Sequence, residues 1–152
     1  MNKLFLMKIS WAIIIYGILD GICVGLGMGI PFFCILLGLP VGWYLARRFL
    51  IKENEPRILL RKILIWSALT AVFTLLFMAV IWLPSIRMLF DPVVIEKLAN
   101  YGIPMILYEP LPSYIGWMAL MILVSPCMQF LLSLFAAILT WLVEISRRPK
   151  QP

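Results

Sequence analysis

Long apolar stretches separated by short polar segments dominate the pattern of the chain. Residues 9–46 contain a single charged residue, Asp20. As one straight helix they would measure about 57 Å, far more than the thickness of a bilayer core. Gly29 and Pro31 supply a break, with Pro31 as the first residue of a second helix. The pattern therefore predicts four membrane helices, the first two forming a tight glycine-rich hairpin, over about residues 9–29, 31–46, 63–83 and 115–143.

Two of the predicted segments leave details open. Residues 31–46 are short for a span and contain Pro40, so a re-entrant segment is the alternative to a full crossing. Residues 84–114 form the one sizeable loop, and Asp91 followed by Pro92 is a good helix start. We expect a short helix from there to about Gly102, lying on the outer membrane surface.

The basic residues indicate the orientation of these spans. With four crossings, every Lys and Arg except Arg87 and Lys97 falls on the side of the two termini and of loop 47–62. Cytoplasmic segments carry an excess of such residues, and the Trp residues lie near the expected span ends, where indole rings prefer to be. We therefore expect an all-α polytopic protein, one domain over residues 1–152, with both termini in the cytoplasm.

Composition supports lipid as the main solvent. The chain is 64% hydrophobic and 13% charged, with a mean hydropathy of +1.05. A soluble domain carries about 25% charged residues. The net charge of +6 does not indicate nucleic-acid binding, because the basic residues crowd the ends of apolar segments instead of forming a phosphate-binding surface. The expected partners are the lipid bilayer and, in addition, further copies of the chain or other membrane subunits.

Small residues recur every four positions on the first two helices. The first helix has Gly17, Gly21, Gly25 and Gly29, and the second continues the theme with Cys34, Gly38, Gly42 and Ala46. Such rows allow close approach of helix backbones in membranes. The economical prediction is a glycine zipper in which the two rows pack on one another across the hairpin. The alternative is that one row faces another copy or a partner subunit.

Asp20 is the one acid within a predicted span. Counted from the inner boundary, Asp20, Thr74 and Gln129 lie at similar depth near the midplane, so the carboxyl group is expected to bond to Thr74 or Gln129. Because no basic residue is predicted there, desolvation favours the neutral form of the acid. Asp20 is then either a polar clasp between helices or a site that binds and releases a proton or cation.

No catalytic residues, metal site or cofactor site are expected. The chain contains no His, its three Cys are isolated from one another in sequence, and its acids are scattered. The run Gly25, Gly27, Gly29 in a hairpin that also holds an acid loosely resembles the rotor-ring subunit of rotary ATP synthases. In that family the glycines and the carboxylate lie on opposite helices, whereas here both are on the first, so no residue role is carried over.

Two functions follow as expectations. The first is a structural or accessory membrane protein that packs through its small-residue faces, alone or as a subunit of a larger complex. The alternative is a small transporter or channel-like protein in which Asp20, with Thr74 and Gln129, binds a proton or cation.

Overall fold

The described part of the chain is 94% helical. The computed structural model describes residues 5, 7–26, 32–53, 55–91 and 110–147. Within these ranges the helices, with a 3₁₀ segment (η1) and a π-helical turn (η2), are α2 (Ile9–Leu26), α3 (Phe32–Leu50), α4 (Pro56–Trp82), η1 (Leu83–Phe90), α6 (Pro110–Ala119), η2 (Leu120–Val124) and α7 (Ser125–Arg147). No β-strand occurs in this part of the chain, as expected for an all-α protein.

Three of the helices are long and apolar enough to cross a membrane: α3, α4 and the continuous segment Leu111–Arg147. α2 is a fourth, shorter apolar helix. α3 runs through Pro40 and reaches Leu50, so the expected end at residue 46 is too early. α4 begins at Pro56 because a proline is well tolerated in the first turn of a helix. The structure describes Asp91, the expected start of a surface helix, as non-helical, and the rest of that expected helix, residues 92–102, lies outside the described residues.

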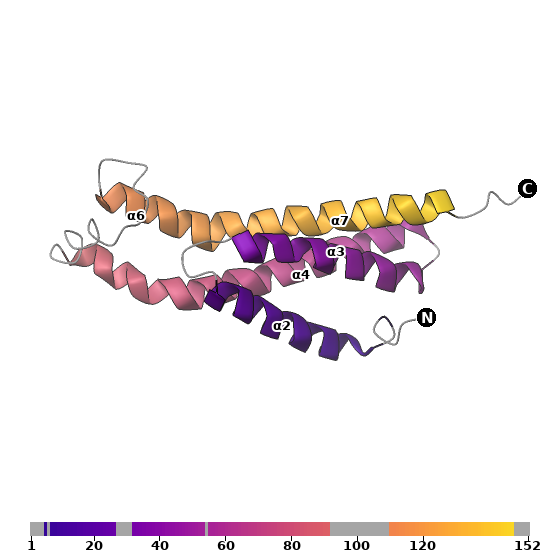
Figure 1. Ribbon diagram of the computed structural model, residues 1–152, viewed down its shortest axis with the longest axis horizontal. Coiled ribbons are helices and arrows are strands. Elements are labelled where there is room, and N and C mark those ends of the chain that lie inside the picture. The colour runs from indigo at the N-terminus through magenta and orange to yellow at the C-terminus, as the bar shows by residue number, and fades with distance from the viewer. Residues whose placement is uncertain (1–4, 6, 27–31, 54, 92–109, 148–152) are drawn as a thin grey trace, which may run out of the picture.

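Figure 1 shows α3, α4 and α7 side by side along the long axis. The first turn of α2, the connection from α3 to α4 and the end of α7 all lie at one end of this bundle. α2 diverges from the other helices toward that end, and it contacts α3 and α4 less extensively than these two contact each other. The bundle core is therefore built by α3, α4 and α7.

Polar and apolar side chains are distributed as in a protein that faces lipid. The buried polar residues include Asp20, Thr74 and Gln129, whereas large apolar side chains such as Val80 and Leu131 point outward. Water would favour the opposite arrangement, because exposed apolar surface is costly there. The fold thus agrees with a membrane environment.

The closest helix contact joins α3 to α7. A Cβ atom built on Gly42 would lie 2.0 Å from the backbone oxygen of Ser133, and one on Gly38 would lie 2.4 Å from that of Gln129. Cys34 and Ala46, which belong to the same row, are also buried. Only glycine permits backbones to approach this closely.

The expected packing of the two small-residue rows against each other is wrong. A Cβ atom on Gly17 or Gly21 would meet nothing within 4 Å, so these glycines contact no other helix of the described chain. α3 instead turns its row toward α7, because Ser133 and Ala137 offer a matching row of small residues. Gly29 lies outside the described residues, and only the backbone of Gly25 is described.

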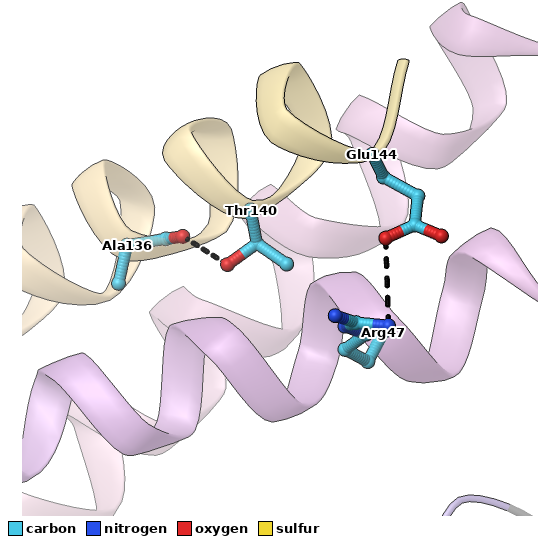
Figure 2. A network of polar contacts seen from close by, with 4 residues as sticks. All are labelled: Arg47, Ala136, Thr140 and Glu144. Carbon is cyan, nitrogen blue, oxygen red and sulfur yellow. Dashed lines mark hydrogen bonds and ion pairs between the residues drawn. The ribbon is translucent and has the colours of Figure 1, made fainter. Parts of the chain in front are cut away.

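Figure 2 shows α3 and α7 toward the end of α7. The guanidinium of Arg47 on α3 forms an ion pair with the carboxylate of Glu144 on α7, at 3.4 Å. One turn earlier on α7, the Thr140 hydroxyl donates to the backbone oxygen of Ala136 at 2.7 Å. An apolar cluster of buried side chains also stabilises this end of the bundle: Leu45, Ala46, Phe49, Leu59, Ile63 and Ala137.

Candidate functional site

The candidate site is a hydrogen-bonded cluster of four buried side chains: Tyr16 and Asp20 of α2, Thr74 of α4 and Gln129 of α7. We call it the Asp20 cluster. Tyr16 and Asp20 share one face of α2 because residues four apart lie above one another on a helix. All four side chains are at most 8% exposed, and Asp20 and Thr74 are fully buried. The cluster therefore joins α2 to two helices of the core.

The bonds form a chain from Asp20 to Gln129. Thr74 Oγ1 lies 2.9 Å from Asp20 Oδ2, and the Tyr16 hydroxyl lies 2.7 Å from Thr74 Oγ1. Gln129 Nε2 donates to the Tyr16 hydroxyl at 2.7 Å. The backbone oxygen of Thr70 lies 3.0 Å from the Tyr16 hydroxyl and 3.3 Å from Thr74 Oγ1, so it can accept from either. Each hydroxyl thus has an acceptor available in more than one direction.

This arrangement accommodates both protonation states of the acid. When Asp20 is ionised, Thr74 donates to it and Tyr16 donates to Thr74 or to the Thr70 carbonyl. When Asp20 is neutral with its proton on Oδ2, it can donate to Thr74, which then donates to the Thr70 carbonyl. The heavy atoms stay in place while only protons move. The bond between Asp20 and Thr74 can therefore reverse its direction without a change in helix packing, while Gln129 Nε2 remains a donor to Tyr16 in both states.

Two oxygen atoms of the cluster have no hydrogen-bond partner. They are Asp20 Oδ1 and Gln129 Oε1, and both are fully enclosed. Neither state of the acid described above supplies a donor to them. Within the described ranges, no Lys or Arg forms an ion pair with Asp20. Such acceptors can bind a water molecule or an oxygen-seeking cation.

Toward the start of α4 and the end of α7, the cluster is followed by hydrogen bonds between small polar side chains of these two helices. The hydroxyls of Ser67 and Ser133 lie 3.1 Å apart, and Thr70 donates to the backbone oxygen of Ser67 at 2.8 Å. Ser67 and Ser133 are buried. These residues lie between the Asp20 cluster and the apolar cluster at the end of the bundle, so the core stays hydrogen-bonded beyond Asp20.

The helix that carries Gln129 is irregular just before it. The turn η2 (Leu120–Val124) is π-helical, and the Ser125 hydroxyl donates to the backbone oxygen of Leu120 at 2.9 Å. Pro126 follows, and proline lacks the backbone N–H that a regular α-helix would use. A π turn offers a different bonding pattern and is common next to functional sites.

The structure brings together the three residues that depth counting placed at one level. The expected bond between Asp20 and Thr74 is present, whereas Gln129 reaches Asp20 only through Tyr16 and Thr74. Tyr16 was missed as a member, although its position one turn before Asp20 indicated the same face. The role of these residues in binding a proton or cation stays a prediction.

The other chemistry-bearing groups are thiols, of which Cys23 and Cys34 lie within electrostatic range of Asp20. Cys23, Cys34 and Cys127 are free thiols, and Cys127 is exposed on the outside of α7. No group of three or more His, Cys, Asp or Glu among the described residues could hold a metal ion. Comparison of the chain with protein-family models, with curated proteins and with solved structures found no match.

Proposed function

We propose that this chain is a small integral membrane protein that acts as a structural or accessory subunit and associates with other membrane proteins, or with further copies of itself, through α2. The supporting observation is the outer face of α2. Gly17 and Gly21 leave open space beside them, and Ile14 and Ile18 on the same face are at least half exposed. Small residues flanked by branched apolar ones are typical of helix–helix contacts in membranes.

The Asp20 cluster supports this role as a clasp. α2 diverges from the bundle toward its first turn (Figure 1), so the bonds from Tyr16 and Asp20 to Thr74 and Gln129 help to fix its position. A helix held mainly by one polar cluster keeps most of its surface available to a partner. In this proposal Asp20 is neutral and has a structural role.

The test is the double substitution Gly17→Leu and Gly21→Leu. Because an added Cβ at either glycine would meet nothing within 4 Å among the described residues, the fold should persist while association through α2 is lost. Ala68→Leu, on an exposed position of α4, is the matched control for added bulk. The measurement is particle size and co-purifying proteins after extraction in a mild detergent. If the double variant retains both and behaves like the control, the proposal is wrong.

A second function is favoured by the two unpartnered oxygens of the Asp20 cluster. We infer that Asp20 binds a proton or a monovalent cation and that the reversible bond chain through Thr74 and Tyr16 adjusts to its charge. Buried acids in membrane helices commonly have such roles. The bond chain supplies a donor for the ionised acid and an acceptor for the neutral one.

Flux measurements separate the two functions. In liposomes that contain the purified protein, a proton- or cation-dependent flux should disappear in Asp20→Asn, which keeps the size of the side chain but cannot ionise. Asp91→Asn, on an exposed acid, is the control. If wild-type protein carries no flux and Asp20→Asn folds normally, the clasp explains Asp20 and the second function is refuted.

A further inference from the structure

An apolar groove of about 310 Å³ opens between α2, α3 and α4. Its walls include Ala12 and Tyr16 of α2, Val41 and Tyr44 of α3, and Phe73 of α4. Its lining residues on α2 fall between Ile9 and Leu19, the part of the helix that diverges from α3 and α4 (Figure 1). The Tyr16 hydroxyl is engaged in the Asp20 cluster, so the groove meets only the apolar part of that side chain.

The groove reaches from the core to the region of the tryptophans. Trp43 and Trp66 line the end near the first turn of α2, together with Met7 and Ile9. Indole rings prefer the headgroup region of a bilayer. The groove therefore extends from headgroup depth toward the level of Tyr16, in the direction that a lipid chain takes.

A buried cation continues the groove-facing row of α3. Arg48 lies about one helical turn beyond Tyr44, in line with Leu37 and Val41. It is only 4% exposed. Its Nη1 donates to the Tyr44 hydroxyl at 2.6 Å, and its guanidinium lies 5.8 Å from the centre of that ring. The charge is thus held against a residue that lines the groove.

Arg48 has no anionic partner among the described residues. Its neighbour Arg47 pairs with Glu144, and Lys62 pairs with Glu53. A hydroxyl and an aromatic ring compensate a buried guanidinium only in part, because removing the charge from water is costly. The described residues therefore supply no anion to this site, and Lys8, exposed between two groove-lining residues, adds positive charge at the same end.

We propose that the groove binds one acyl chain of an anionic phospholipid and that Arg48 binds the phosphate of its headgroup. The apolar walls match a hydrocarbon chain, and a guanidinium matches the geometry of a phosphate. Basic pockets between helices on the cytoplasmic side of membranes recognise anionic lipids in this way. The site faces away from Gly17 and Gly21, so it is separate from the proposed association surface.

The first experiment uses wild-type protein in lipid discs that contain phosphatidylglycerol and phosphatidylcholine with identical acyl chains. Lipids that stay bound after extraction are counted by native mass spectrometry. One charged bond contributes enough free energy for a preference of about tenfold for phosphatidylglycerol. Equal retention of the two lipids would overturn the proposal.

Two variants with matched controls identify the site. Arg48→Gln should abolish the preference, whereas Arg57→Gln, an exposed arginine in the first turn of α4, should keep it. Val41→Trp should fill the groove and lower retention of both lipids. Leu64→Trp adds the same ring on an exposed face of α4 and should have no effect.

Circular dichroism and particle size report on the fold of each variant. If Arg48→Gln does not fold, the wild-type preference and Val41→Trp still decide the question. Retention of the preference in folded Arg48→Gln, or an equal loss of lipid in the two Trp variants, shows that the lipid binds elsewhere and refutes the proposal.

Discussion

Replacing one hydrogen atom of Gly42 by a methyl group, in Gly42→Ala, should destabilise the packing of α3 against α7. In Gly42→Ala the new Cβ would lie 2.0 Å from the backbone oxygen of Ser133 and 2.8 Å from its carbonyl carbon. Ordinary contacts begin at 3.4 Å, so α3 and α7 must separate by about 1.4 Å at this point. Neither atom belongs to a side chain that can rotate away. The separation would also reduce the contact at Gly38, one turn earlier.

The expected loss of stability is about 2 kcal/mol. Overpacking a well-packed core costs about 1–3 kcal/mol, and a clash with backbone belongs at the upper end of that range. Replacing glycine within a helix returns up to about 1 kcal/mol. The net change corresponds to roughly a 30-fold increase in the unfolding equilibrium constant. Gly21→Ala makes the same chemical change where no other described helix lies within 4 Å of the new Cβ, so it should be neutral or slightly stabilising.

Reversible unfolding in mixed micelles measures the difference. The protein is titrated with sodium dodecyl sulfate and its helical content is followed by circular dichroism, so that each variant yields a free energy of unfolding. Gly38→Ala, with a clash at 2.4 Å, should fall between the other two variants. Equal stabilities for Gly42→Ala and Gly21→Ala would show that the contact between α3 and α7 is not the close backbone packing described above.

The same titration tests the polar contacts. Thr74→Val removes the donor to Asp20 and should cost about 2 kcal/mol, whereas Thr74→Ser should retain most of the stability; equal losses would exclude the hydroxyl as the cause. Gln129→Leu removes one of several bonds to the Tyr16 hydroxyl and should cost less, about 1 kcal/mol. Glu144→Gln breaks a partly exposed ion pair and should change stability by under about 1 kcal/mol, with a larger effect contradicting its peripheral role.

Depth in the membrane was readable from the sequence. Each helical residue advances about 1.5 Å, and charged residues mark where the apolar segments start. Counting from those marks placed Asp20 level with Thr74, and the two side chains are hydrogen-bonded. The same count could not show that Tyr16 connects Gln129 to this pair, because depth carries no information on the direction in which a side chain points.

Which helix packs against which could not be predicted from the sequence. A row of small residues shows that some backbone comes close, but it does not say which one. The predicted hairpin packs Gly38 and Gly42 against the preceding helix, α2. In the structure they contact Gln129 and Ser133 on α7. α3 packs against α7, which is more distant in sequence, because α7 also has small residues at four-residue spacing. The small residues of α2 lie on a face that points away from α3.

The Asp20 cluster also places a constraint on biosynthesis. Thr74 follows Asp20 by 54 residues, and Gln129 follows Tyr16 by 113. At a translation rate of about 5–20 residues per second, these partners are made about 3–11 s and about 6–23 s later. Until Thr74 is made, the carboxyl group of Asp20 lacks its final hydrogen bond, and until Gln129 is made the Tyr16 hydroxyl lacks one of its own. The nascent chain therefore depends on the insertion machinery, or on neighbouring water, to shelter one carboxyl group until α4 is in place.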